Sequence, residues 1–586
     1  MAEKALGSRE VGATLREVAT LLELKGDNPF KVKAYSNAAR SIELLEEDLS
    51  KIVQEGTLRK IQGIGEALAG QITELVQTGR LQLLDDLRSM VPPGHLEMLK
   101  IPGLGPKKIK SLHDSFTIKT VGELEYACLE NRLVGLQGFG LKTQEKILQG
   151  IQQVKKYQGQ YLYGDVIAPA EKILRTILSH PKVIRAKLAG SLRRKMEVVR
   201  NINLVASTDH PQEILTAFSK LPEVEVVRFK DQGSTRYALF SGVEVDLQVV
   251  PDQIFPFSLY HLTGCLNHWN AVCRRAKELD FELSEQGLHR HHRPILCKEE
   301  EGILDALGMD FIPAELREDQ GEIEAAESRQ LPRLVEDGDV RGVFHVHSSY
   351  SDGTRSIKIM AEEARKMGLS YIGLSDHSPS AGYAGGLSLE KLKKQWEEID
   401  QWNREMDGFH IFKGTESDIL PDGSLDYEEA LLKRFDFVIA SVHSHFNLPM
   451  EAMTRRVIQA LRNPHTTVLG HPTGRLLLAR EPYAIDMIQV IDEAARTGVA
   501  IELNAHPFRL DIDWRLCKYA KEKGAKVIIN PDAHNEEGLR DTPFGVGIAR
   551  KGWLEPADIL NTLDVEAMSG FLKGRKPGQE SPTPKG

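Results

Sequence analysis

The chain is poor in cysteine. Its 586 residues include five cysteines, and none of them forms a Cys-x-x-Cys pair or an even framework. This spacing excludes a disulfide scaffold and a cysteine-based zinc site, and it indicates a reducing compartment. We therefore expect a cytoplasmic protein.

Long apolar runs are absent as well. The first ten residues contain no apolar signal core, and no run approaches the ~18 apolar residues of a membrane span. The composition is otherwise ordinary for a globular protein, with 41% hydrophobic and 27% charged residues. The length predicts roughly three to five domains, and we expect no membrane partner.

An excess of positive charge is also missing. The formal net charge of −9 argues against a general affinity for nucleic acids. The charge is uneven, because residues 299–339 are rich in Asp and Glu. Within that stretch, residues 320–338 are predicted to be an interdomain linker. Residues 573–586, rich in Pro, Gly and Lys, are predicted to be a disordered tail.

The last third of the chain contains a scattered set of histidines and acids, most of which follow short apolar runs. They are His345, His347, Asp352, His377, Glu416, His443, His471, Asp532 and His534. Imidazole and carboxylate together suit Zn²⁺, Mn²⁺ or Fe²⁺, and clustered metals of this kind activate water and hold a phosphate. A lone histidine at a strand end is more often structural, but its recurrence at successive strand ends favours a metal site.

The apolar runs themselves predict a fold. Buried parallel strands are predicted at residues 343–344, 371–374, 437–440, 467–469 and 527–529. Helices are predicted between them at residues 356–367, 388–405, 451–463, 483–497 and 514–523. This alternation predicts a (β/α) barrel whose ligands lie at the carboxyl ends of the strands. His-x-His and Asp-x-His would place both side chains on one face of an extended strand end.

Residues 339–572, with these motifs and with the segments 470–475 and 504–511, resemble the PHP (polymerase and histidinol phosphatase) domain fused to bacterial family X DNA polymerases. The resemblance implies a distorted barrel of seven βα units. It also implies that the nine residues above bind two to three divalent metals, Mn or Zn and alternatively Fe.

In this interpretation Glu416, His345 and Asp532 are catalytic. Together with His347 they would hold one metal, and the remaining ligands would share the others. Two arginines have alternative roles that the sequence leaves open. Arg475 and Arg509 either clamp substrate phosphates through their planar guanidinium groups or form salt bridges at the barrel rim.

The N-terminal third repeats one motif three times: apolar, any residue, Gly, apolar, Gly. It occurs at residues 61–65, 101–105 and 136–140, and helices are predicted after it at 66–78, 106–113 and 141–151. The glycines allow a tight turn and a close backbone approach, and the amides that begin the next helix can bind a phosphate oxygen. Three copies predict helix-hairpin-helix elements that contact the DNA backbone. The expected contacts are Gly63, Gly65, Gly103, Gly105, Lys107, Lys108, Gly138 and Gly140.

Residues 28–35 resemble the helical N-terminal domain of family X polymerases, so the resemblance extends over nearly the whole chain. It implies helical helix-hairpin-helix domains, a nucleotidyltransferase palm and thumb of α+β type, and the α/β barrel. The domains implied are a helical DNA-binding domain (1–82), a fingers-like helix-hairpin-helix domain (83–155), the palm (156–255), the thumb (256–319), the linker (320–338), the barrel (339–572) and the tail (573–586).

The polymerase-like part carries the family's Gly-Ser turn. Residues 189–194 resemble this nucleotidyltransferase motif, in which Gly190, Ser191 and Arg194 would bind a nucleotide triphosphate at a helix N-terminus.

The polymerase carboxylates, in contrast, are incomplete. The family motif needs an Asp-x-Asp pair and a third Asp, but here Asn201 and Asn203 replace the pair and Asp246 alone remains. Two neutral amides remove two charges that attract Mg²⁺. We therefore expect that the Mg²⁺ site is weak or lost, and that polymerase activity is weak or lost with it. Gln71 stands where relatives with lyase activity carry a Schiff-base lysine, and an amide cannot form an imine.

The leading hypothesis is a DNA-repair enzyme: a metal-dependent 3′–5′ exonuclease or 3′-end phosphoesterase on gapped or nicked DNA. One alternative is an active gap-filling polymerase with an accessory PHP exonuclease. Another is a DNA-binding repair scaffold. A small-molecule phosphatase is disfavoured because it would not need three hairpins. We expect DNA as the partner, a monomer, and a bacterial cytoplasmic location associated with the nucleoid.

Overall fold

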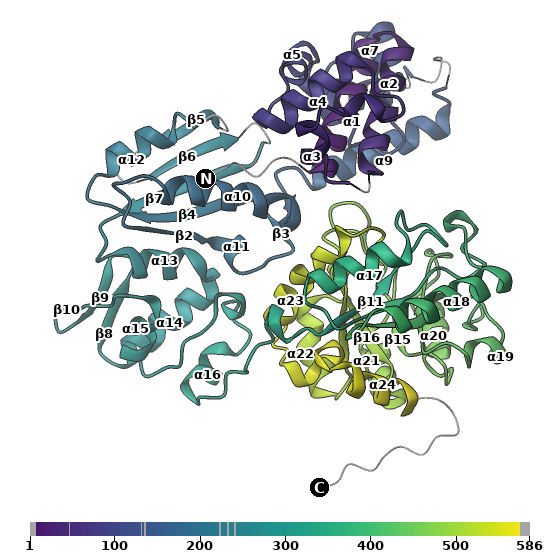
Figure 1. Cartoon of the computed structure of the whole chain (residues 1–586). Coiled ribbons are helices and arrows are strands. Elements are labelled where there is room, and N and C mark those ends of the chain that lie inside the picture. Colours follow the sequence, from purple (N-terminus) through teal and green to yellow (C-terminus); the bar gives the residue numbers. More distant parts are fainter. Residues whose placement is uncertain are drawn as a thin grey trace. The chain divides into compact units, whose positions relative to one another are not determined.

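The computed structural model describes residues 7–574, except residues 46, 131, 134, 135, 137, 222–223, 231–233 and 240–241. The chain divides into two compact units, Met1–Gln158 and Gly159–Gly586 (Figure 1). Among the described residues, no helix is both long enough and apolar enough to cross a membrane. The predicted tail lies outside the described residues from position 575 onward, and Lys573 belongs to a helix.

The first unit is entirely helical in its described part. Its elements are α1 (Ser8–Lys25), α2 (Pro29–Glu43), α3 (Leu49–Gln54), η1 (Leu58–Lys60), α4 (Glu66–Thr78), α5 (Gln82–Met90), α6 (Pro93–Met98), α7 (Pro106–Phe116), α8 (Val121–Leu129) and α9 (Leu141–Lys156). α4 has the predicted bounds. α7 and α9 start where predicted but run further, because Phe116 and Val154 still pack against the core of this unit.

The second unit begins with a palm-like region. Its elements are β1 (Tyr161–Leu162), α10 (Tyr163–Leu178), β2 (Arg185–Ala189), α11 (Gly190–Arg193), β3 (Val198–Val199), β4 (Asn201–Ser207), α12 (Pro211–Phe218), β5 (Val224–Lys230), β6 (Ser234–Leu239) and β7 (Glu244–Val250). Five strands form one sheet in the order β2-β4-β7-β6-β5. β4 and β7 run parallel and pair Asn203 with Asp246.

The thumb region follows. Its elements are α13 (Phe255–Thr263), α14 (Leu266–Glu278), β8 (Phe281–Ser284), β9 (Gly287–Arg290), β10 (Arg293–Ile295), α15 (Glu300–Ala306), η2 (Ala314–Leu316), α16 (Glu322–Glu327) and η3 (Asp337–Asp339). Ile323, Ala326 and Leu334 are buried in the thumb core. Most of the stretch predicted to be a linker, residues 320–338, is therefore packed structure, because its apolar residues have a core to join.

The rest of the second unit is a parallel barrel surrounded by helices (Figure 1). Its strands are β11 (Gly342–Val346), β12 (Tyr371–Leu374), β13 (His410–Asp418), β14 (Phe437–Ser441), β15 (Val468–Leu469), β16 (Ala500–Asn504) and β17 (Val527–Asn530). Its helices are α17 (Ile357–Lys366), α18 (Leu389–Glu405), α19 (Glu429–Leu432), α20 (Met450–Leu461), α21 (Met487–Thr497), α22 (Trp514–Glu522), α23 (Thr542–Lys551) and α24 (Val565–Gly574). Short 3₁₀ turns are η4 (Gly382–Ala384), η5 (Gly538–Asp541), η6 (Pro556–Asp558) and η7 (Leu560–Thr562).

The barrel prediction is confirmed. The seven strands are neighbours in chain order, and a parallel bridge between Val346 and Ala533 joins the end of β11 to the segment just after β17. Two strands, β13 and β16, were not among the predicted runs. Each of them contains charged or amide side chains, such as Glu416 in β13 and Glu502 in β16, which interrupt the apolar pattern.

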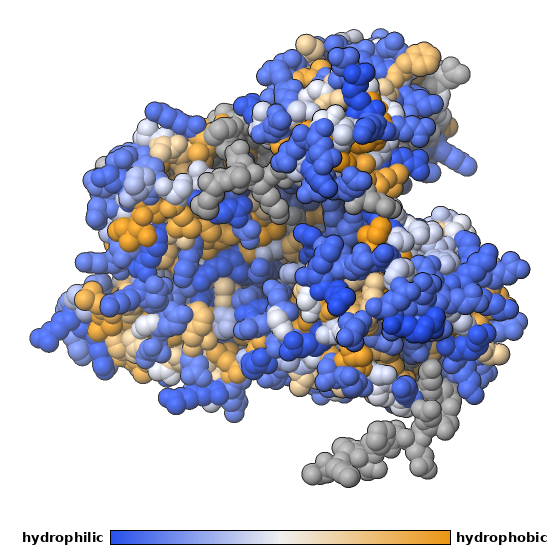
Figure 2. Space-filling view, in the orientation of Figure 1, coloured by the Kyte–Doolittle hydropathy of each residue, from blue (hydrophilic) through white to orange (hydrophobic). Residues whose placement is uncertain are grey.

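One end of the barrel is closed by packed aromatic rings. Phe344 and Phe437 lie with Met568 and Leu572 of α24 in one buried cluster. Gly414 makes room for this packing, because a Cβ there would come within 2.1 Å of the Phe437 ring. The interior at this end is therefore full, and the polar interior lies at the carboxyl ends of the strands. Hydrophilic residues cover most of the barrel face seen in the space-filling view (Figure 2).

Candidate metal centre

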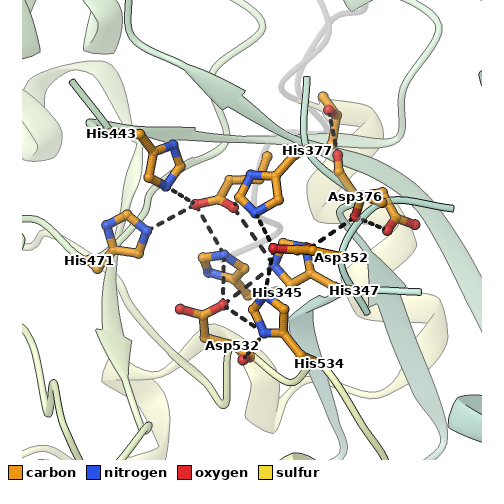
Figure 3. A network of polar contacts seen from close by, with 12 residues as sticks. His345, His347, Asp352, Asp376, His377, His443, His471, Asp532 and His534 are labelled. Carbon is orange, nitrogen blue, oxygen red and sulfur yellow. Dashed lines mark hydrogen bonds and ion pairs between the residues drawn. The ribbon is translucent and has the colours of Figure 1, made fainter. Parts of the chain in front are cut away.

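All nine predicted ligands meet at the carboxyl ends of the barrel strands (Figure 3). The donor atoms form overlapping groups in which every pair lies within 4.8 Å. The groups are His347, Asp352, His377 and His534; His345, His471 and Asp532; His345, His347 and Glu416; and His377, Glu416 and His443.

Two histidines of the cluster, His345 and His347, lie near the carboxylates of both Glu416 and Asp532. His345 Nε2 lies 3.2 Å from Glu416 Oε1 and 3.5 Å from Asp532 Oδ1. His347 Nε2 lies 3.4 Å from the same Asp532 oxygen and 3.7 Å from Glu416 Oε2. Each of the two imidazoles is therefore near both carboxylates.

Asp352 gathers a second set of donors. Its Oδ2 lies 3.4 Å from His377 Nε2 and 3.3 Å from His534 Nε2. The other ring nitrogen of His347, Nδ1, lies 3.6 Å from Asp352 Oδ1. His347 therefore faces both sets of donors.

Glu416 is the carboxylate that the remaining donors share. Its Oε1 lies 2.9 Å from His471 Nε2 and 3.2 Å from His443 Nε2, and its Oε2 lies 3.0 Å from His377 Nδ1. Five histidines therefore approach this one carboxylate, which connects the groups of donors.

Several buried ring nitrogens of the cluster make no hydrogen bond of good geometry, although most of them lie beside a carboxylate oxygen. Among the described residues they include His345 Nε2, both nitrogens of His347, His377 Nδ1 and His471 Nδ1. Buried polar atoms without partners are rare in folded proteins. Imidazole nitrogens beside carboxylates are the donors that Zn²⁺, Mn²⁺ and Fe²⁺ prefer, so these residues fit divalent metals.

Two members of the cluster, Glu416 and His347, are held in their deprotonated forms. Burial raises the pKa of Glu416, but His345, His443 and His377 outweigh burial, and the pKa lies well below its ordinary value. Burial and the neighbouring His534 lower the pKa of His347 to about 3. The carboxylate is therefore charged and this imidazole neutral at physiological pH, which are the forms that bind metals.

The backbone at three ligands is strained. His345, His471 and Asp532 have φ values of 57°, 24° and 53°, in the left-handed region that non-glycine residues seldom adopt. The pairing of β11 with β12 also shifts between Val343 and Val346. His345 and His347 thus do not converge through the regular extended strand that the sequence predicted. An irregular strand end aims them, and such strain is typical of functional sites.

The sequence prediction missed the residues that orient the ligands. Glu502, fully buried, accepts hydrogen bonds from His345 Nδ1 at 2.6 Å and from the His471 amide at 2.6 Å. Asp418 lies 2.6 Å from His443 Nδ1. A carboxylate on the second ring nitrogen fixes the tautomer that presents the first to a metal. The sequence does hold one signal for such residues: an acid flanked by apolar residues, such as Glu502, is seldom buried unless it has a partner.

The two arginines differ. Arg475 donates to the carbonyl of Arg509 at 2.9 Å and forms ion pairs with Asp513 at 2.9 Å and with Glu197 of the palm region at 3.5 Å. These contacts match the salt-bridge alternative. The Arg509 guanidinium lies 3.5 Å from Asp532 Oδ2, so Arg509 alone of the two reaches the cluster.

The polymerase-like carboxylate site is occupied by amides. Asn201 Nδ2 donates to Asp246 Oδ2 at 2.6 Å, and the Asn201 and Asn203 side chains exchange hydrogen bonds of 3.2 and 3.4 Å. The Asn203 side chain packs against Gly190, where a Cβ would lie 2.4 Å from Asn203 Nδ2. Amide hydrogens thus stand where a cation would meet Asp246.

The Gly-Ser turn is present, but its arginine has other partners. Gly190 has φ 64° and begins α11 with Ser191. Arg194 donates to Glu318 at 2.7 Å and to the carbonyl of Thr263 at 2.7 Å. A nucleotide contact from Arg194 would require this ion pair to open.

The three hairpins of the first unit share one backbone geometry. Gly63, Gly103 and Gly138 have φ values of 88°, 82° and 89°. The apolar residue after each of them is buried and donates its amide to the carbonyl three residues earlier. Gln137, within the third motif, lies outside the described residues.

The second glycine of each hairpin is not explained by a positive φ. A Cβ at Gly65, Gly105 or Gly140 would meet no atom within 4 Å. Packing within the chain therefore does not require glycine there, whereas the close approach of an external backbone would. Lys107 is 89% exposed, and Lys108 instead donates to the Gly103 carbonyl at 3.0 Å within the hairpin.

Comparison with known families agrees with these modules. A PHP domain model matches residues 344–506, and a DNA polymerase beta thumb model matches residues 258–318. A helix-hairpin-helix domain model matches residues 8–81, and a SAM-like helix-hairpin-helix tandem model matches residues 96–153. The fold and the site thus define a protein that joins helix-hairpin-helix and polymerase-type modules to a PHP barrel.

Individual relatives narrow this class. The chain is 37% identical over 571 residues, 96% of its length and 99% of the relative's, to the DNA polymerase/3′-5′ exonuclease PolX of Bacillus subtilis. The barrel part is 31% identical over 244 residues to a probable phosphatase of Thermoanaerobacter sp., a match that covers 40% of the chain and 94% of the relative. It is 28% identical over 241 residues to a probable phosphatase of Syntrophotalea carbinolica, which covers 39% of the chain and 95% of the relative. The chain belongs to the PolX family, the bacterial family X DNA polymerases with a PHP domain.

Proposed function

We propose that the protein is a metal-dependent DNA phosphodiesterase of repair, which removes nucleotides or blocking groups from 3′ ends at gaps and nicks. The observation that carries this proposal is the convergence of nine donors at the barrel end, with buried ring nitrogens that make no hydrogen bond of good geometry. The similarity to a polymerase with 3′–5′ exonuclease in its name supports the choice of substrate.

The donor set suits two to three divalent metals, with Mn²⁺, Zn²⁺ or Fe²⁺ as the candidates. His345, His347, Glu416 and Asp532 would hold one, and the donors around Asp352 and around His443 and His471 would hold the others. When bound, such metals supply a water made nucleophilic at neutral pH and neutralise the charge of the phosphate.

The chain's own groups then have separate tasks. Glu416 keeps its negative charge in the buried cluster and holds the donors from several strands at one point. Arg509 reaches the same cluster from the loop after β16 and offers a guanidinium group to a phosphate oxygen. Glu502 and Asp418 hold the His345 and His443 rings in the orientation that binding requires.

Substrate binding falls to the hairpins. Amides at the start of α4, α7 and α9 can bind phosphate oxygens next to Gly65, Gly105 and Gly140, where no side chain obstructs the approach. Such contacts hold the DNA backbone without regard to sequence. Lys107 adds an exposed charge to the second hairpin.

The polymerase-like region acts mainly as a scaffold in this proposal. Mg²⁺ binding in a nucleotidyltransferase depends on clustered carboxylates, and here the Asn201 amide donates to the one that remains, Asp246. The alternative of an active gap-filling polymerase has the support of the family name and predicts extension with Mg²⁺ and nucleotides.

The test uses the full-length protein with Mn²⁺ and a gapped duplex labelled on the primer strand. Wild type is expected to shorten the primer from its 3′ end. His345→Ala is expected to abolish shortening, because it removes a donor shared by two groups of the cluster. Asp246→Ala is expected to leave shortening almost unchanged and serves as the matched control in the polymerase-like site.

Each alternative has its own outcome. A wild-type protein that binds metal but never shortens the primer would favour the repair scaffold. Robust extension after nucleotides are added, lost in Asp246→Ala, would identify a working polymerase.

A further inference from the structure

An exposed aromatic side chain, Tyr383, lies beside the cluster of predicted metal ligands and has no part in the proposed reaction. Tyr383 belongs to η4 in the loop after β12, and it is 74% exposed. The centroid of its ring lies 6.1 Å from that of His377 and 6.3 Å from that of His443. Core packing does not account for the residue, because most of its surface faces solvent.

The hydroxyl of Tyr383 also lies within the field of the cluster. Burial is the largest factor that raises the pKa of Tyr383, and the carboxylates of Glu416 and Asp418 raise it further. The charge of Arg509 lowers this pKa. Tyr383 and Arg509 come from the loops after β12 and β16, and both border the cluster: Tyr383 lies beside His377 and His443, and Arg509 lies 3.5 Å from Asp532. A flat apolar ring and a cation at one site match a nucleotide, which has a flat base and a charged phosphate.

We propose that Tyr383 stacks on the base of the 3′-terminal nucleotide and so makes the barrel select nucleotide ends over small phosphate esters. This inference rests on the proposed exonuclease function. Aromatic rings stack on any base, because every base has a π-face. Since related barrels occur in proteins named probable phosphatases, the barrel alone does not choose the substrate. A residue beside the cluster, such as Tyr383, can make that choice.

The test compares two gapped duplexes that differ only at the 3′-terminal nucleotide, which is either normal or a tetrahydrofuran abasic analogue. Full-length wild type with Mn²⁺ is expected to remove the normal nucleotide with a kcat/KM about 5- to 100-fold higher. Tyr383→Phe is expected to keep this preference. Tyr383→Ala is expected to remove both nucleotides at the wild-type rate for the abasic one. Ile488→Ala, at a 43% exposed apolar residue of α21, is the matched control.

The possible failures are distinct. If Tyr383→Ala slows both substrates equally, the ring supports the loop or the metals, and the stacking role is overturned while the exonuclease stands. Metal content measured on each variant separates those two supporting roles. If wild type shortens neither duplex, the proposed function is overturned and this inference with it.

Discussion

The carboxylate of Glu502 offers a sharp test of how the protein tunes its metal site. Each of its oxygens accepts two hydrogen bonds: Oε1 from His345 Nδ1 at 2.6 Å and Asn530 at 2.9 Å, and Oε2 from the His471 amide at 2.6 Å and Asn504 at 3.2 Å. In Glu502→Gln one oxygen becomes an NH₂ group, so two of the four donors face another donor. Whichever way the amide turns, either the His345 ring or the His471 backbone loses its partner.

The expected magnitude follows from these contacts. Two buried donors without partners cost about 1–3 kcal/mol each in stability. Loss of a ligand's orienting partner lowers metal affinity about 10- to 100-fold, or about 1.4–2.8 kcal/mol of binding free energy. Metal affinity is measured by titrating Mn²⁺ into chelator-treated protein, and chemical denaturation of the metal-free protein measures stability separately.

Glu451→Gln is the matched control, since its side chain is 86% exposed and pairs with Arg455 at 3.8 Å on the surface. It is expected to change neither quantity. If Glu502→Gln folds and binds Mn²⁺ as tightly as wild type, the argument that this carboxylate fixes the His345 tautomer is refuted.

Three further predictions concern other parts of the chain. Gly105→Ala is expected to change the free energy of unfolding by no more than about 0.5 kcal/mol, because the added Cβ meets no atom within 4 Å. The same Cβ is expected to obstruct the DNA backbone and to weaken DNA binding in anisotropy titrations. Gly103→Ala, at φ 82°, is expected to cost about 1 kcal/mol of stability in chemical denaturation. Burial raises the pKa of Glu300, but its two arginine partners outweigh burial and lower it to about 2. The full stabilising contribution of Glu300 is therefore present at pH values above its ordinary pKa, and about 3 kcal/mol of stability is lost as the pH falls toward 2. The free energy of unfolding of Glu300→Gln should depend less on pH in this range, and the same dependence as wild type would contradict this reasoning. Asn201→Asp with Asn203→Asp should raise Mg²⁺-dependent primer extension at least about tenfold, as expected for restored carboxylates; no gain would mean that more than charge was lost.

Much of the fold was predictable because it depends on local patterns. Apolar runs and amphipathic stretches predicted five of the barrel strands and the helices between them, since each pattern depends on one element's own burial. β13 and β16 escaped because they carry Glu416 and Glu502, whose charges break the apolar run. The stretch of residues 320–338 escaped because burial of Ile323 depends on a thumb core assembled from distant segments.

The sequence by itself determined the chemistry of the site. Ligand-type residues recur after apolar runs, and parallel strands that close into a barrel bring their carboxyl ends together. With the resemblance to the PHP domain, this pattern predicted the nine residues whose donor atoms the structure brings together. Only the tertiary structure decided which residues orient them and which arginine reaches them. His345 and Glu502 are 157 positions apart, and their hydrogen bond exists because the barrel closes and turns both side chains inward. Arg475 and Arg509 look alike in sequence, but Glu197 of the palm region faces the first and the metal cluster faces the second, and no local pattern encodes that difference.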